Sequence, residues 1–193
     1  MRSPVRELKV RAEILHHQLQ ALQPPAAVGA PMPPPLVRLR ALTELRRASE
    51  AAVWEAAAGV RRKHCLAVVA RELGFASFEH ARRVLDGDPA EGDFGTLLYG
   101  AGGAAYLNHW FATHGEARAQ QVEAADTGPR QYLLAYKRQC FLAERGFVEA
   151  LGFDADDPDW AAIGWDWVRP RDLEARGRLY ARRLLSLPAG AAS

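Results

Sequence analysis

Two polar stretches interrupt apolar segments in the carboxy-terminal half of the chain. The first contains His109, and the second contains Tyr136, Lys137, Arg138 and Gln139. A strand with one buried face carries polar residues at its centre only where solvent or partners satisfy them. If the two segments pair as strands, His109 could face Lys137 or Gln139 in a small cationic pocket of an enzyme or ligand binder. The alternative is the solvent face of a one-layer sheet.

These residues supply the candidate catalytic groups, which are His109, Tyr136, Lys137 and Arg138. Imidazole, phenol and amine groups can transfer protons, and a guanidinium can hold an anion. The pattern of apolar and polar residues in these two segments fits both a ligand pocket and a sheet face exposed to solvent. The catalytic assignment therefore depends on whether the side chains converge.

A cluster of aspartates resembles a calcium-binding loop at first sight: Asp154, Asp156, Asp157 and Asp159. Such a loop needs a glycine at its sixth place and a glutamate at its twelfth. Here Pro158 intrudes, and Trp165 stands at the twelfth place. We therefore expect the aspartates to cap a following helix and to bind no metal.

Other motifs for cofactors are also incomplete. The glycine-rich stretch at 100–103 follows a candidate strand, but it matches neither the dinucleotide-binding nor the Walker pattern. Cys65 and Cys140 have neither CxxC spacing nor a zinc partner set, so we expect reduced core residues. The sequence predicts no metal and no cofactor.

Residues 64–85 carry a recognisable pattern, Ala70-Arg71-Glu72-x-Gly74-Phe75-x-Ser77-Phe78. This segment resembles a helical module that occurs in bacterial proteins ahead of glyoxalase-like or ankyrin-repeat domains. The resemblance covers about a ninth of the chain and implies a helical hairpin without an assigned catalytic residue.

A helix, a tight turn and a second helix also form the geometry of a DNA reader. Phe78 occupies a place where a recognition helix needs a polar side chain, which favours packing. Residues 1–86 hold 14 basic and 8 acidic residues, against 11 and 15 in residues 87–193. The asymmetry indicates either a basic surface for nucleic acid or two halves that attract each other. We favour the second reading and expect no nucleic-acid binding.

The start of the chain predicts an amphipathic helix within residues 1–23. Ser3 and Pro4 suit a helix start, and leucines recur behind them at spacings typical of a coiled-coil seam. A proline-rich linker at 24–35 follows. We therefore expect a non-enzymatic protein-interaction module that binds a protein partner or its own copy. The candidate partner-binding residues are Leu8, Leu15, Leu19 and Leu22.

The remaining pattern predicts a helical region at 36–90 and a small α+β region at 91–193, packed together as one domain. Within 36–90, one helix is expected to run from about residue 36 to about residue 58. Strands are expected at 94–99, 104–111 and 132–143, with a helix at 114–125. The fold class is thus α+β, mainly helical, with a small and largely antiparallel sheet.

The composition indicates where such a protein would act. Arginine far outnumbers lysine and alanine is abundant, as is typical of bacterial genomes of high GC content. The chain has neither an apolar stretch of about 20 residues nor an apolar signal region. We expect a cytoplasmic protein with no membrane contact.

Overall fold

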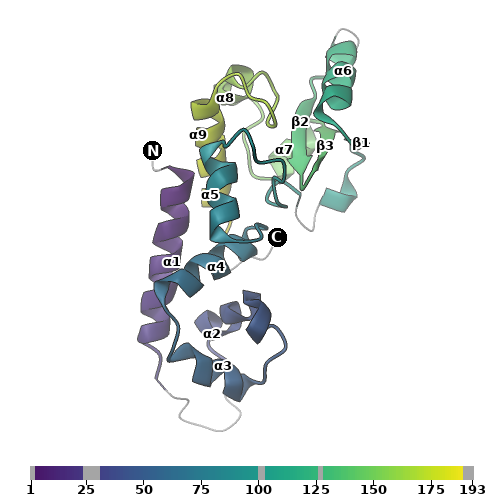
Figure 1. Cartoon of the computed structure of the whole chain (residues 1–193). Helices are drawn as coiled ribbons and strands as arrows, with labels where there is room; N and C mark the ends of the chain where they lie inside the picture. Colours follow the sequence, from purple (N-terminus) through teal and green to yellow (C-terminus); the bar gives the residue numbers. More distant parts are fainter. Residues whose placement is uncertain (1–2, 24–30, 100–102, 126–127, 189–193) are drawn as a thin grey trace.

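The computed structural model describes residues 3–23, 31–99, 103–125 and 128–188. It confirms the α+β class, with a predominance of helix and a small antiparallel sheet in the carboxy-terminal half. In Figure 1, helices α1 to α4 lie at the left and bottom of the view, and the sheet and α6 lie at the upper right. The elements before the sheet are α1 (Pro4–Gln20), α2 (Pro34–Arg38), α3 (Glu50–Ala57), α4 (Arg62–Glu72) and α5 (Phe78–Asp86).

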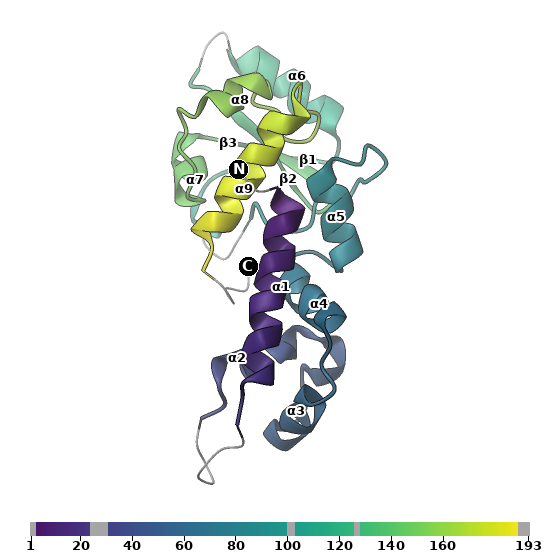
Figure 2. The same cartoon turned by 90° about the vertical axis from the view of Figure 1, so that its left-hand side faces the viewer.

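Helix α1 begins as the sequence predicts, because the Ser3 side chain accepts a hydrogen bond from the Arg6 amide. Its apolar stripe is buried inside the molecule: Leu8 and Leu15 are fully buried and Leu19 is 7% exposed. Leu22 packs partly buried against the same core. The stripe contacts α4, α5 and α9 (Leu173–Ser186) of the same chain, and Figure 2 shows α1 running beside α9 and α5. The four leucines expected to bind a partner are therefore core residues here.

The helix expected from residue 36 to about 58 is instead broken into short pieces. Helix α2 begins at Pro34, inside the expected linker, and passes into the 3₁₀ turns η1 (Leu39–Ala41) and η2 (Thr43–Leu45). Leu42 between these turns has an extended backbone, with ψ 135°. With the helix broken here, Leu36, Leu39 and Leu42 are all buried in the main core. Residues 24–30 of the linker lie outside the described residues.

The sheet has the strand order β1-β3-β2, with both pairs antiparallel. Its strands are β1 (His109–Phe111), β2 (Tyr132–Tyr136) and β3 (Gln139–Ala143). The expected single strand at 132–143 is thus a hairpin, whose turn lies at Lys137 and Arg138. Lys137 has φ 51°, a conformation for which glycine or asparagine is the usual choice, so the sequence lacked the ordinary turn signal.

The segment expected as a strand at 94–99 is irregular, but it links the two halves of the chain. Thr96 N donates to Gly74 O at the end of the α4 turn, and Lys137 N donates to Gly95 O at the hairpin turn. Gly95 has φ 66° and lies so close to Gly74 O that a Cβ would sit 2.6 Å from it. The backbone conformation at Gly95 interrupts the strand that the side chains suggest.

The two faces of the sheet pack against different layers. One face carries Leu134 and Phe141 and belongs to the main core. The other carries Leu133, Cys140 and Leu142 and forms a small second core with Ala117 of α6 (His114–Ala125). Of the remaining elements, α7 (Arg145–Ala150), α8 (Pro158–Ala162) and α9 contribute to the main core, and the short turn η3 (Gly103–Ala105) precedes β1. Among the described residues, no helix has the length and apolar character needed to cross a membrane.

We predict that Leu15→Ala lowers the free energy of unfolding by about 2–5 kcal/mol, because the substitution leaves a cavity in the core under α1. The adjacent Ile14 is 50% exposed and serves as the matched control. Ile14→Ala should change stability by less than about 0.5 kcal/mol. Urea unfolding followed by circular dichroism measures both, and equal stability of the two variants would mean that the α1 stripe is not packed in solution.

Candidate functional site

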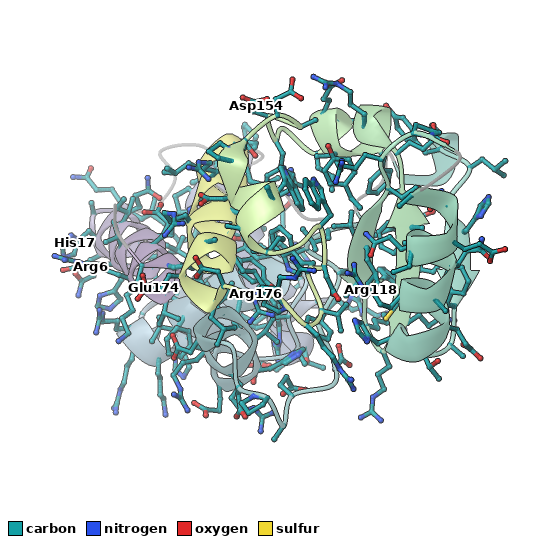
Figure 3. All side chains as sticks on the ribbon, turned by 90° about the horizontal axis from the view of Figure 1, so that it is seen from above. Arg6, His17, Arg118, Asp154, Glu174 and Arg176 are labelled. Atoms are coloured by element: carbon teal, nitrogen blue, oxygen red, sulfur yellow. The ribbon has the colours of Figure 1, made fainter. Side chains whose placement is uncertain are left out.

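A pocket of about 600 Å³ opens at the junction of the two halves. Its wall combines the turn after α5 at 87–92, the hairpin at 138–140, the first residue of α6, the loop at 168–170 and the first turn of α9. Figure 3 views the molecule from above, with Arg176 on the side of α9 that faces the sheet and α6. Because the pocket draws on five separate segments, only the folded chain assembles it.

Arg176 is the most deeply buried charge in this wall. Its side chain is 4% exposed, and Nη1 donates to Trp167 O at 3.1 Å. Among the described residues it has no carboxylate partner. Arg183, which is 8% exposed, instead donates to two backbone carbonyls, Leu97 O and Leu151 O. A buried guanidinium with so few partners is costly unless an anion compensates it.

The glycine opposite Arg176 keeps the space beside the guanidinium open. Gly87 ends α5 with φ 80°, which favours glycine. A Cβ at this position would lie 2.9 Å from Arg176 Nη2. Any larger residue would therefore press on the charged group as well as strain the helix cap.

Two further arginines line the pocket from other segments, Arg138 in the hairpin turn and Arg169 in the loop before α9. Both are exposed, and neither has an ion pair among the described residues. Of the two acidic side chains in the wall, Glu91 pairs with Arg83 at 2.8 Å, and Asp88 Oδ1 accepts from Ala90 N. Glu91 is thus paired, and the three arginines outnumber the remaining charge of Asp88, so the net charge of the described lining residues is positive.

His114 is part of the same wall and is paired with Asp166, which lies behind the lining residues. His114 Nε2 lies 2.7 Å from Asp166 Oδ2, and the other carboxylate oxygen accepts from the amides of Val168 and Arg169. Asp166 is 5% exposed, so these hydrogen bonds, rather than water, stabilise its carboxylate. The carboxylate fixes the imidazole ring through Nε2 and leaves Nδ1 without a described partner. This arrangement can exchange a proton with a ligand in the pocket.

Helix α6 is attached to residues 164–166 by polar contacts along one face. After His114, Arg118 donates to Gly164 O and Gln121 Nε2 donates to Trp165 O at 3.0 Å. These three residues are spaced by four and three positions, which places them in one row on a helix. Hydrogen bonds to residues 164–166 thus add to the few apolar contacts that hold α6 in place.

Cys140 also lines the pocket, but it is 5% exposed. Burial raises the pKa of the thiol, and the charge of Asp166 raises it further. No hydrogen bond joins the thiol to His114 among the described residues. Cys140 is therefore suited to packing rather than to nucleophilic attack.

The structure separates the residues that were expected to form a catalytic group. His109 pairs with Leu142, because β3 lies between β1 and β2, so His109 faces neither Lys137 nor Gln139. Arg138 and Gln139 do line the pocket, whereas His109, Tyr136 and Lys137 do not. Tyr136 instead packs against the Tyr99 ring, with centroids 5.3 Å apart.

The residues that sequence reasoning missed are His114, Asp166 and Arg176. His114 falls in a capping box, where Thr113 and Glu116 exchange hydrogen bonds, so its sequence context pointed only to a helix start. Asp166 stands 52 residues further along the chain. Only the pairing of distant segments brings the two together, and no local motif signals it.

The aspartate cluster holds elements together. Asp157 is the N-cap of α8, as the sequence predicts, and accepts from Asp159 N. Asp159 is 5% exposed and binds Arg178 Nε at 3.0 Å and Arg182 Nη1 at 2.6 Å. These bonds fasten α8 to α9. Within the described ranges, no group of three or more potential ligands is placed to hold a metal ion.

The polar residues of α5 are engaged within the chain. Arg82 pairs with Glu79 at 2.6 Å, and Arg83 pairs with Glu91. His80 is 8% exposed, and its Nε2 lies 2.7 Å from Asp93 O. A recognition helix would present such groups to bases, so this pattern favours packing.

Comparison with known proteins gives no match: no family model, no curated protein and no solved structure matches this chain. The functional reading therefore rests on the geometry of the pocket.

We predict that Asp159→Asn lowers stability at pH 7 by about 1–3 kcal/mol, because it removes the charge that two arginines bind. The hydrogen bond from Arg178 lowers the pKa of the Asp159 carboxyl below its usual 3.8. A lowered pKa contributes stability above the unfolded-state value, and this contribution is lost as pH falls through the folded-state value. The difference between wild type and Asp159→Asn should thus shrink below about pH 4.

Chemical unfolding at pH 7 and at about pH 3 measures this difference. The control is Asp156→Asn, because Asp156 is highly exposed and, among the described residues, its only ion pair is with Arg145 on the surface. That variant should remain close to wild type at both pH values. A constant difference for Asp159→Asn across the pH range would contradict the assigned charge interaction.

Proposed function

We propose that the protein binds a small organic anion in the pocket at the junction of its two halves. The observation that carries the proposal is Arg176, a buried guanidinium that lines the pocket and has no carboxylate partner among the described residues. Arg138 and Arg169 add charge from two other segments, and carboxylates and phosphates are the groups that arginine binds in bidentate geometry.

The rest of the lining suits a ligand with an apolar body. Val84, Phe94 and Leu173 stand in the wall with the arginines, and Leu173 is 53% exposed although it is apolar. A pocket that mixes apolar side chains with a few charged groups is typical of sites for small molecules. The ligand class is therefore a carboxylate or phosphate joined to a hydrocarbon or aromatic group.

His114 adds a polar group to the arginines of this site. Asp166 Oδ2 lies 2.7 Å from His114 Nε2 and orients the imidazole ring, and Nδ1 has no partner among the described residues. The ring can therefore make a hydrogen bond to a ligand in the pocket.

We predict that benzoate and phenyl phosphate bind the protein saturably, whereas the neutral analogue benzamide does not. Arg176→Gln should weaken phenyl phosphate by at least about tenfold, since a charged hydrogen-bonded pair contributes about 1.5–3 kcal/mol. Calorimetric titration measures the affinities. Arg138→Gln and Arg169→Gln test the same pocket with exposed side chains, so they keep the test valid if Arg176→Gln fails to fold.

The matched control is Arg47→Gln, because Arg47 is an exposed arginine outside the pocket. It should bind phenyl phosphate as the wild type does. Equal binding by all the pocket variants, or equal binding of benzamide and benzoate, would overturn the proposed function.

A second candidate function is self-association through the edge strand β1. The strand order leaves β1 at one edge of the sheet. Leu107 just before it is 94% exposed, and Tyr106 and Trp110 are each 39% exposed. An open edge with apolar side chains can pair with the same edge of a second copy.

We predict a concentration-dependent dimer that Leu107→Glu and Trp110→Glu abolish, because charges at a symmetric edge repel each other. Light scattering measures the mass, and Ile14→Glu on the outer face of α1 is the control. A monomer for the wild type at all concentrations would rule out this second function.

A further inference from the structure

A second pocket, of about 300 Å³, lies between the later turns of α6, residues 128–131 and the loop before α9. Residues 164–171 contribute to it at Gly164 and Arg171, while residues 168–170 of the same loop line the first pocket. Its charged lining side chains are Arg118, Arg130 and Arg171, and none of the described lining residues is acidic. The charged groups among the described lining residues are thus all positive.

Arg130 is held in place by an aromatic ring. Its guanidinium carbon lies 3.7 Å from the centroid of the Trp165 ring. The flat face of the guanidinium stacks on the face of the indole ring, and its N–H groups point outward from the edge, where they can donate hydrogen bonds. Arg130 has no hydrogen bond or ion pair among the described residues, so these donors are available to an anion.

The ring itself is fixed by an unusual backbone conformation. Trp165 has φ 52°, which is rare for a bulky residue and costs conformational energy. Three hydrogen bonds hold it there: its amide donates to Trp160 O at 2.8 Å, and its carbonyl accepts from Leu133 N and Gln121 Nε2. The surrounding structure therefore imposes the position of the indole and, through it, that of Arg130.

The other two arginines come from different elements. Arg118 is anchored through Nη1 to Gln121 Oε1 and to Gly164 O, and Figure 3 shows Arg118 on the side of α6 that faces α9. Arg171 passes over Gly164, where a Cβ would lie 3.1 Å from its Nε. Arg171 is exposed and has no described side-chain partner. Three guanidinium groups from three segments thus meet at one small cavity.

An acceptor in the same wall specifies the ligand further. Gln131 lines this pocket, and its Oε1 is buried with no hydrogen-bond partner among the described residues. A buried acceptor without a donor is costly, and a ligand that supplies an O–H group beside its negative oxygens would satisfy it. Phosphate carries such a hydroxyl near neutral pH, whereas sulfate does not.

We propose that this second pocket is a phosphate-binding site, in which Arg118, Arg130 and Arg171 hold the negative oxygens and Gln131 Oε1 accepts from the phosphate hydroxyl. The site is independent of the organic-anion pocket, because the two lining sets share no residue. The ligand is either free phosphate or a small phosphate monoester with a further alcohol group, because a monoester near neutral pH is mostly the dianion and its alcohol O–H would have to serve as the donor to Gln131.

The test is calorimetric titration of the full chain with inorganic phosphate, glycerol 3-phosphate and sulfate, together with amide NMR spectra. Phosphate should shift the amides of Trp165 and Gln131, and sulfate should bind at least about fivefold more weakly. Tighter binding of glycerol 3-phosphate than of phosphate identifies a monoester as the ligand, and the reverse order identifies free phosphate.

Two exposed arginines provide the variants, Arg130→Gln and Arg171→Gln, and each should weaken phosphate by at least about tenfold. Arg138→Gln, in the first pocket, is the matched control and should leave the phosphate-induced shifts of the Trp165 and Gln131 amides unchanged. The proposal is overturned by unchanged phosphate affinity in both variants or by no binding at about 10 mM phosphate. Equal affinities for sulfate and phosphate would overturn the role assigned to Gln131.

Discussion

The candidate sites depend on the backbone hydrogen bonds between β2 and residues 165–167. Leu133 N donates to Trp165 O and Trp167 N donates to Leu133 O, each at 2.9 Å. This short parallel bridge covers the outer edge of β2, which would otherwise expose unpaired donors and acceptors. It also fixes Asp166 opposite His114 and Trp165 beneath Arg130. The loop that follows the bridge contributes residues to both pockets.

The arginines of the chain have distinct structural roles that composition alone does not reveal. Arg183 is buried and donates to two backbone carbonyls, and Arg178 and Arg182 neutralise Asp159. These residues tie α9 to its neighbours. Arg176 is buried beside a pocket and, among the described residues, has one hydrogen bond, to Trp167 O, and a contact of 5.7 Å with the centroid of the Tyr180 ring. This contrast within one helix supports the proposed binding role of Arg176, because a buried charge without a carboxylate partner is costly unless a ligand compensates it.

Much of the helical architecture follows from local sequence signals. Ser3 and Asp157 cap helices where the sequence predicts, because a cap involves residues within one turn. The helix at 114–125 is also confirmed. The hairpin at 132–143 was missed, because Lys137 adopts a positive φ without glycine or asparagine to signal it. Of the polar residues that the sequence singled out, Arg138 and Gln139 line the pocket, whereas the contact between His114 and Asp166 joins residues 52 positions apart and has no local signal.

The central claim is that Arg176 and its neighbours form an anion site at the junction of the two halves. A crystal structure with 4-iodobenzoate tests it most directly, because anomalous scattering locates the iodine independently of the surrounding atoms. The account predicts the iodine among Val84, Phe94 and Leu173, with the carboxylate hydrogen-bonded to Arg176. A pocket without the ligand, in crystals that hold 4-iodobenzoate elsewhere on the protein, would contradict it.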